Sequence, residues 1–256
     1  MTIVCEIAFV APRPAPPVVA PSVELIREWA GLPELLFLDL YTPVTGSATD
    51  PLVDDGAAPA CLAKLGVPSL DVLDHVVRVE RFGAALADGI LTCTAMRRSE
   101  HAVAGAASPL VAPFSYLVRY HRPAEDEAAF VRHYLDTHPL LLARLPRIRN
   151  VMCYVPLAWR HPAGFPVADY MLGNEVVFDH NEDFNAAMAS PVRHELRAHF
   201  HQFPPFSGRN THYPMDRRRL FPDTSRRGSC RATHCVALVQ QRQMSEEGEA
   251  VPRPYR

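Results

Sequence analysis

The sequence predicts an α+β protein in which two ferredoxin-like repeats, each of order β-α-β-β-α-β, pair into one barrel. Two observations predict it: a short motif that occurs twice, and the same order of apolar segments around both copies. The motif is Leu-Pro, seven residues and then Tyr-x-Pro, and it begins at Leu32 and again at Leu145, 113 positions later. A fixed spacing of this kind indicates a duplicated structural unit.

The segments around the two motifs follow one order. The expected elements of the two copies are strands at 3–12 and 114–123, helices at 23–29 and about 130–141, strands at 34–41 and 147–155, strands at 61–67 and 170–178, helices at about 69–88 and 181–201, and strands at 90–96 and about 206–213. Ser22 can cap the first helix, and each Leu-Pro pair ends the helix before it. Apolar residues at helical or alternating spacing define the other elements.

Two sheets of this kind can cover each other, because each has one face under its helices and the other face bare. We expect units at 1–107 and 112–215, a ligand cavity between the sheets, and a mostly disordered tail at 216–256. Arginine clusters in the tail could contact nucleic acid or acidic lipid, but a solvated tail is the preferred interpretation. We therefore expect neither nucleic acid nor a membrane as a partner, and a homodimer is an open alternative.

Composition indicates a globular chain of 256 residues, 48% of them apolar, with a formal net charge of −2. This balance excludes a general polyanion binder and a disordered acidic chain. The first ten residues lack the basic start of a signal peptide, and Glu6 interrupts their apolar run. No stretch reaches the ~18 apolar residues of a membrane span. We expect a cytoplasmic protein whose six scattered cysteines are reduced, buried thiols.

Four motifs of the second repeat carry a family resemblance. They are Tyr134-Leu135-Asp136-Thr137-His138-Pro139-Leu140, the break at Leu145-Pro146, Glu175-Val176-Val177-Phe178-Asp179, and Phe184-Asn185-Ala186-Ala187-Met188-Ala189-Ser190-Pro191. With them, about residues 112–215 resemble the EthD family of the dimeric α+β barrel superfamily. Arg147 stands where that family commonly has Gly, which concerns a turn. The first repeat matches only in the order of its elements.

The resemblance implies the fold and a small aromatic, lactone-like or polyketide-like substrate on which proton transfer acts. Relatives of this kind include lactone isomerases, polyketide cyclases, dehydratases, decarboxylases, monooxygenases and haem enzymes. The expected function is therefore a cofactor-independent isomerase, lyase, dehydratase or decarboxylase. The alternative is a carrier that binds a hydrophobic metabolite for a partner oxidase.

His138 is the first catalytic candidate. It follows Tyr134 by four residues and Val131 by seven, so the three share one helix face. Pro139 lacks a backbone donor and is expected to start a new turn there, with Thr137 as its cap. A histidine at such a break can reach a cavity and titrate near neutral pH, as a general acid/base requires. The alternative is a core histidine that is hydrogen-bonded to a carbonyl.

Glu175 is the second catalytic candidate, because it lies in an otherwise apolar strand. Alternation places it opposite Val176 and Phe178, pointing into the barrel. Burial would raise the pKa of its carboxyl group, which could then act as a base or orient a histidine. The alternative is a salt bridge at the sheet edge with Arg119 or Arg149.

Five further residues are candidate substrate ligands. They are Arg119 and His121 on one face of a strand, Tyr154 at the end of the second motif, and Asn210 and His212 on one face of the last strand. Arginine suits a carboxylate or phenolate. Exposure of Arg119 is an equally good interpretation, and the counterpart of Tyr154 at Tyr41 favours a structural role.

No cofactor is expected. His194, His199 and His201 are spaced five and two residues apart, which is not the i, i+4 pair of a helical zinc site. No CxxCH, P-loop, GxGxxG or GxSxG motif occurs in the sequence. The enzyme and carrier hypotheses differ in whether His138 and Glu175 converge on one cavity.

Overall fold

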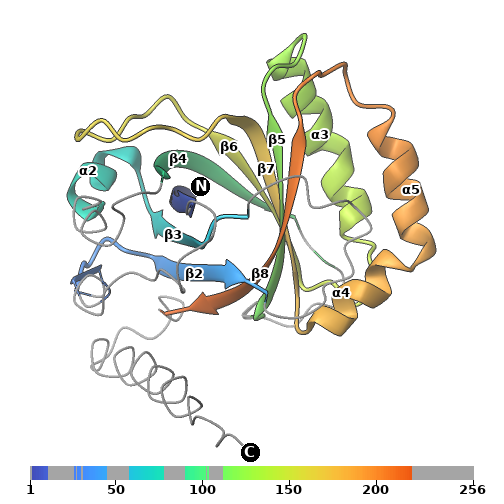
Figure 1. Ribbon diagram of the computed structural model, residues 1–256, viewed down its shortest axis with the longest axis horizontal. Helices are drawn as coiled ribbons and strands as arrows, with labels where there is room; N and C mark the ends of the chain where they lie inside the picture. Colours follow the sequence, from blue (N-terminus) through green and yellow to red (C-terminus); the bar gives the residue numbers. More distant parts are fainter. Residues whose placement is uncertain are drawn as a thin grey trace, which may run out of the picture.

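Eight antiparallel strands close into one barrel in the computed structural model, with helices covering its outside (Figure 1). The structure describes residues 2–10, 26, 28–29, 31–44, 58–77, 90–101, 103 and 112–220. Its strands are β1 (Thr2–Val10), β2 (Phe37–Pro43), β3 (Cys61–Val67), β4 (Ile90–His101), β5 (Phe114–His121), β6 (Asn150–Pro156), β7 (Tyr170–Phe178) and β8 (Asn210–Arg219). Its helices are η1 (Leu70–Val72), α2 (Leu73–Val76), α3 (Glu127–Leu142), α4 (Asn181–Met188) and α5 (Pro191–Phe200).

Each repeat forms one half of the barrel. The strand order around the barrel is β1-β3-β2-β8-β5-β7-β6-β4, so the halves are β4-β1-β3-β2 and β8-β5-β7-β6. Two antiparallel seams join them: β2 pairs with β8, and β4 pairs with β6. The predicted fold class is confirmed, and the closed sheet leaves no strand among the eight without a neighbour on each side.

Helices α3, α4 and α5 cover the outer face of the second half (Figure 1). Alternate residues of its strands point outward, and Phe184 from α4 packs on two of them. The ring of Phe184 lies 5.1 Å from that of Phe114 and 4.5 Å from that of Tyr116. Aromatic pairs of this kind stabilise a fold by roughly 0.5–1.5 kcal/mol each beyond the area they bury.

Helix α3 begins at a side-chain cap, because the Asp126 carboxylate accepts a hydrogen bond from the Ala129 backbone N–H at 2.8 Å. The predicted break at Pro139 is wrong, since α3 continues through that residue to Leu142. Thr137 caps nothing, and its hydroxyl donates to the His133 carbonyl. Apolar residues before and after Pro139 pack the helix on the sheet. The free energy of this packing outweighs the loss of one backbone hydrogen bond.

Other boundaries also differ from prediction. The helix expected over 181–201 is divided, because Ser190 is extended and Pro191 starts α5 as its first residue. The boundary of the expected tail at 216 is wrong, because β8 runs to Arg219 and places its arginines in the barrel wall. The segments 11–25, 78–89 and 221–256 lie outside the described residues, and with them most of the predicted helix 23–29, part of 69–88 and most of the predicted tail.

The turn after α3 explains the unusual residue at 147. Arg147 has φ 61°, which is the left-handed region that favours glycine. Its exposed guanidinium donates to the Asp183 carboxylate at 2.6 Å. The turn thus holds Arg147 in a conformation that glycine adopts more readily.

The positive φ at position 147 should therefore limit which residue types the position tolerates. Arg147→Val is expected to destabilise the protein by about 1–2 kcal/mol, because a β-branched residue is strained at positive φ. Arg147→Gly should lose no stability beyond ~0.5 kcal/mol, the value of an exposed ion pair. Urea denaturation of the three proteins measures both changes, and equal stability of the Val and Gly variants would contradict this account.

None of the helices in the described part of the chain combines the length and the apolar character that a membrane crossing needs.

Candidate functional site

The wall of the barrel separates the predicted site residues into two groups. Glu175, Arg119, His121 and Tyr154 point into the barrel, where Glu175 and Tyr154 meet at 2.7 Å. His138 lies outside, on α3, and lines a cavity together with Asn210 and His212. His138 and Glu175 therefore lie on opposite sides of β7 and do not share a cavity.

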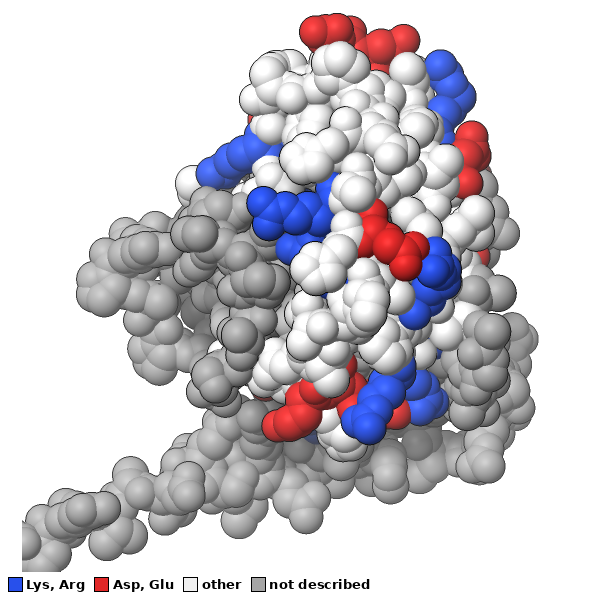
Figure 2. Space-filling model, turned by 90° about the vertical axis from the view of Figure 1, so that its right-hand side faces the viewer, with Lys and Arg blue, Asp and Glu red and all other residues white. Residues whose placement is uncertain are grey.

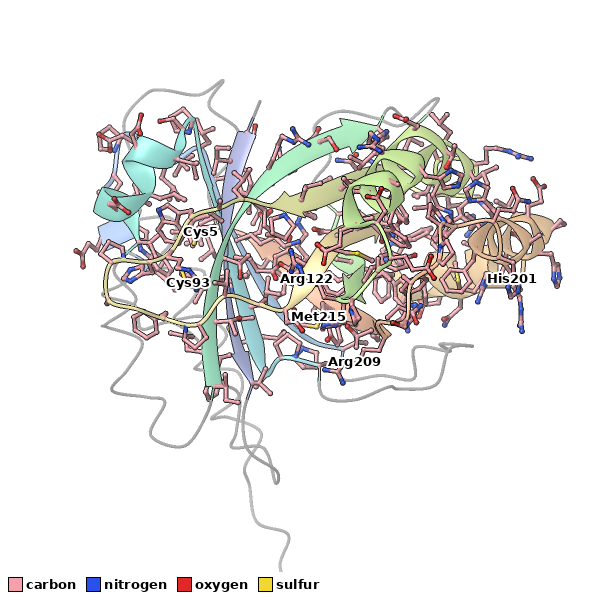
Figure 3. All side chains as sticks on the ribbon, turned by 90° about the horizontal axis from the view of Figure 1, so that it is seen from above. Cys5, Cys93, Arg122, His201, Arg209 and Met215 are labelled. Carbon is pink, nitrogen blue, oxygen red and sulfur yellow. The ribbon has the colours of Figure 1, made fainter. Side chains whose placement is uncertain are left out.

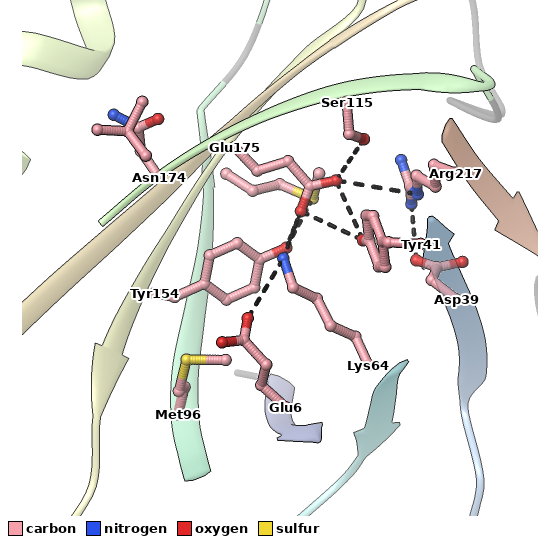
Figure 4. Close-up of polar contacts among 12 residues, drawn as sticks. Glu6, Asp39, Tyr41, Lys64, Met96, Ser115, Tyr154, Asn174, Glu175 and Arg217 are labelled. Carbon is pink, nitrogen blue, oxygen red and sulfur yellow. Dashed lines mark hydrogen bonds and ion pairs between the residues drawn. The ribbon is translucent and has the colours of Figure 1, made fainter. Parts of the chain in front are cut away.

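Glu175 is the centre of a buried cluster inside the barrel (Figure 4). Its carboxylate accepts hydrogen bonds from the Lys64 ammonium, the Tyr154 hydroxyl and the Ser115 hydroxyl, each at 2.7 Å. The Tyr41 hydroxyl donates to it at 3.1 Å. Tyr41 and Tyr154, the tyrosines of the two motifs, therefore donate hydrogen bonds to the same carboxylate from opposite halves of the barrel.

The charges around Glu175 decide its protonation. Burial acts to raise the pKa of its carboxyl group, but Lys64 and Arg217 together outweigh burial and hold that pKa below its ordinary value. The predicted raised pKa is wrong, because the sequence did not reveal which cations face Glu175. Glu175 is thus a fully buried carboxylate with four hydrogen-bond donors, and it anchors the ionic cluster inside the barrel.

Two more carboxylates inside the barrel are paired in the same way. Glu6 accepts from the Arg119 guanidinium and, at 2.8 Å, from the Tyr170 hydroxyl. Asp39 accepts from Arg217 at 2.8 Å and from Arg219 at 2.8 Å. Arg119 is thus already occupied by a carboxylate of the protein.

Sequence reasoning missed most of this cluster, although a signal was present. Glu6, Asp39 and Lys64 each stand alone at an inward position of an otherwise apolar strand, and they lie side by side across β1, β3 and β2. The inward position of Gly173 in the second half carries no side chain. A Cβ there would lie 2.8 Å from a guanidinium nitrogen of Arg119, so glycine makes room for that arginine.

The second polar region is a cavity of about 410 Å³ between the outer face of β5, β7 and β8 and the helices α3, α4 and α5. Its walls are largely aromatic and aliphatic, including Tyr116, Tyr120 and Phe200. A few polar side chains reach it: His138, Asn174, Arg193, Arg197, His201, Asn210 and His212. An apolar cavity with few polar groups is the usual form of a small-molecule site. We name it the outer cavity.

His138 is held in one orientation at the wall of the outer cavity. It lies on the buried face of α3 as predicted, and its side chain and backbone are together 6% exposed. Its Nδ1 lies 3.1 Å from Nδ1 of His199 on α5, and its ring packs 4.9 Å from that of Tyr134. One Nδ1 must donate to the other, so Nε2 is the nitrogen of His138 left for a cavity ligand.

The surroundings of His138 keep it neutral. Burial lowers its pKa to about 3, and the neighbouring His199 and His133 act in the same direction. The predicted titration near neutral pH is therefore wrong for the protein without a ligand. At pH 7 the imidazole is neutral and can accept a proton only from a group that the cavity makes acidic.

This lowered pKa predicts an acid-dependent loss of stability. As the pH falls below 6.5, the unfolded chain protonates His138, whereas the folded protein does not until about pH 3. The unfolded state then binds more protons, so stability falls with pH in this window. Between pH 7 and pH 5 the wild type should lose about 1–2 kcal/mol more than His138→Gln, as measured by urea denaturation. An equal loss of stability in the wild type and in His138→Gln would refute the lowered pKa of His138.

Asn174 is a cavity residue that sequence reasoning missed. Its side-chain amide donates to the Tyr134 hydroxyl, while its buried Oδ1 has no hydrogen-bond partner in the described residues. The only signal was its place beside Glu175 in an apolar strand. On β8, Asn210 also lines the cavity, and His212 stacks on Tyr116 with ring centroids 5.8 Å apart.

The protein surface over these helices carries basic and acidic side chains next to each other (Figure 2). That mixture is typical of a solvated surface. Within the described ranges no group of three or more His, Cys, Asp or Glu side chains is arranged to hold a metal ion. His194 and His201 are exposed, and His199 contacts His138 instead.

Comparison with known proteins agrees with this fold. An anthrone oxidase-like protein is 10% identical over 85% of this chain and 92% of its own, with a TM-score of 0.53. A mutant chlorite dismutase from Candidatus Nitrospira defluvii is 13% identical over 84% and 91%, with a TM-score of 0.46. An EthD family protein from Bacillus halodurans C-125 is 22% identical over 38% of this chain and 95% of its own, with a TM-score of 0.31.

No curated protein matches the chain in sequence. The model of the EthD domain family matches residues 122–203, which include His138, the helices α3, α4 and α5, and β7, but neither β5 nor β8. Over these residues the second repeat of the α+β barrel is therefore similar to an EthD domain.

Proposed function

We propose that the outer cavity binds a small planar compound, of aromatic, lactone-like or polyketide-like type, and that His138 transfers a proton of that compound without a cofactor. The reaction class is isomerisation, elimination, dehydration or decarboxylation. The observation that carries the proposal is the position of His138: buried at the cavity wall, with Nδ1 bound to His199 and Nε2 left to the cavity.

The cavity can make such a transfer favourable although the free imidazole is a weak base. Transfer from a C–H or O–H group to Nε2 leaves an imidazolium beside an anion, and this opposite charge raises the pKa of His138. His199 shares a hydrogen bond with His138 and is half-buried, so it gives the proton a route to solvent. Arg193 and Arg197 at the cavity add positive charge that favours an anionic intermediate.

The flat aromatic walls set the shape of the compound. Tyr116 and Tyr120 line one side, and the helix residues Leu196 and Phe200 line the other. Polar groups converge at His138, Asn174 and Asn210. Such a site fits a fused-ring or lactone body with one or two oxygens to be hydrogen-bonded.

Deuterium exchange tests the proposal without knowledge of the product. The full chain is incubated in ²H₂O with anthrone, butenolides and aromatic β-dicarbonyl compounds, and NMR follows the acidic C–H of each. Anthrone is included because one structural neighbour is named for it. We expect at least one compound to exchange faster than in buffer and to lose this acceleration in His138→Gln. Acceleration that persists in His138→Gln would remove the catalytic assignment.

A carrier function is the second candidate, and the lowered pKa of His138 favours it. A carrier would bind one of these compounds saturably in calorimetry while its C–H exchanged at the buffer rate. The same samples therefore separate the two functions.

A further inference from the structure

A second cavity opens at one end of the barrel, between the two halves, and the proposed function does not use it. Its volume is about 770 Å³. Its floor is the ion pair of Glu6 with Arg119, together with Tyr170. The wall formed by β5, β7 and β8 separates it from the outer cavity. In Figure 3, His201 of the outer cavity lies out beyond the strands, whereas Arg122 and Arg209 of the second cavity lie near them.

The two halves of the barrel give this cavity two different walls. The first half supplies small and apolar side chains: Ala8, Val10, Pro59, Leu62 and Ile90. The second half supplies mostly polar and charged ones, Arg119, His121, Arg122, Asp169, Arg209 and Thr211, beside the small apolar Val167 and Ala168. The cavity is therefore amphiphilic, with an apolar side facing a polar side.

The apolar wall continues to the rim of the cavity. Ile90 is 63% exposed there, one of two large apolar side chains so exposed among the described residues. An apolar group at a cavity mouth stabilises a ligand that carries an apolar body through the opening.

The polar wall has one cation, Arg209, that forms no ion pair among the described residues, although the exposed carboxylate of Asp169 lies 3.9 Å from Arg122. Arg119 is paired with Glu6, and Arg122 with Glu127 at 3.1 Å. Arg209 makes no ion pair within the described part of the chain. Its carbonyl accepts from the His121 N–H at 2.8 Å, and Gly208 before it packs against the His121 carbonyl, where a Cβ would come within 1.9 Å. The backbone that carries Arg209 is thus fixed to the end of β5.

A neutral hydrogen-bonding pair lies beside Arg209. His121 Nδ1 donates to the Asp169 carbonyl at 2.6 Å, and the Thr211 hydroxyl lies 2.9 Å from Nε2. Burial lowers the pKa of His121, and the guanidinium groups of Arg209 and Arg119 act in the same direction. The hydrogen bond to the Asp169 carbonyl and the Asp169 charge oppose this lowering of the pKa without reversing it. An anion at this wall would meet the Arg209 guanidinium, whereas the hydrogen of the Thr211 hydroxyl is donated to Nε2 of His121.

We propose that this cavity at the barrel mouth is a binding site for a small amphiphilic carboxylate. The apolar body lies against Ala8, Leu62 and Ile90, and the carboxylate lies on the opposite wall near Arg209 and Thr211. The site is separate from the outer cavity, so the two can be occupied at once.

Octanoate is the test ligand, and isothermal titration of the full chain at pH 7 measures its affinity. Two charge reversals form a matched pair of exposed or half-buried arginines: Arg209→Glu at the barrel mouth and Arg193→Glu at the outer cavity. We expect Arg209→Glu to weaken octanoate binding by about tenfold or more, and Arg193→Glu to change it less than about twofold. The neutral probe 1-octanol should bind Arg209→Glu as it binds the wild type.

Filling each cavity gives an independent second measurement. Thr92→Trp places an indole in the barrel mouth and should abolish binding of both probes, whereas Met188→Trp fills the outer cavity and should leave both intact. Circular dichroism checks that the variants fold. Absence of saturable octanoate binding to the wild type would overturn the proposal, as would loss of binding in Arg193→Glu or Met188→Trp with retention in Arg209→Glu. Neither result bears on proton exchange at His138.

Discussion

Replacing His138 with Gln should lower the rate of catalysed proton exchange by roughly 10²- to 10⁴-fold, the usual contribution of a positioned proton-transfer group. Gln has a similar size and can keep one hydrogen bond to His199, so the cavity should retain its shape. It has no basic nitrogen to accept a proton. Single-turnover exchange rates followed by NMR, in the compound that the wild type accelerates most, measure the effect.

His194→Gln is the matched control, because His194 is an exposed residue of α5 outside the lining of the outer cavity. It should exchange at the wild-type rate. If His138→Gln instead loses stability at pH 7 while each folded molecule exchanges normally, then His138 is a structural residue that holds α3 and α5 together.

Replacing Glu175 with Gln should destabilise the protein by about 3–5 kcal/mol, the cost of removing one member of a buried ion pair. Gln keeps an acceptor for Tyr154 and Ser115 but leaves the Lys64 ammonium in the barrel without its carboxylate at 2.7 Å. Domains are commonly stable by only ~5–15 kcal/mol, so the loss should be obvious in urea denaturation.

The double variant Lys64→Met, Glu175→Gln removes both charges and serves as the control. It should recover most of the loss, because the cost of Glu175→Gln lies in the stranded charge. If Glu175→Gln costs less than ~1 kcal/mol, water reaches the cluster and Glu175 regains a place among the catalytic candidates.

The repeated pattern was enough to predict the fold. The repeat gave the order of the elements, and alternation in the strands gave the inward orientation of Glu175 and the shared face of Arg119 and His121. These are local properties of the chain, because side-chain direction along a strand depends only on its period of two. The same alternation placed Asn210 and His212 on one face of β8.

The alternation of residues along a strand does not predict which residues of distant strands come into contact. The low pKa of Glu175 depends on Lys64, which lies 111 positions before it in the other half of the barrel, and on Arg217, which lies on β8. The low pKa of His138 depends on its burial and on His199 from another helix. A bulge between Tyr120 and His121 also turns Tyr170 inward, and a residue count along β7 does not predict it. The register of the strands and the contacts of each inward side chain are fixed only in the closed barrel.

The charged cluster inside the barrel also gives its two halves opposite net buried charges. The first half buries Glu6, Asp39 and Lys64, a sum of −1, and the second buries Arg119, Glu175 and Arg217, a sum of +1. Two copies of either half would enclose unmatched charge of one sign, whereas the two together are neutral. The two covalently linked halves therefore pair as the subunits of a heterodimer do. The buried charges of each half are complementary to those of the other half and would repel those of a second copy of itself. The outer face of the second half takes no part in this pairing, and it carries the outer cavity.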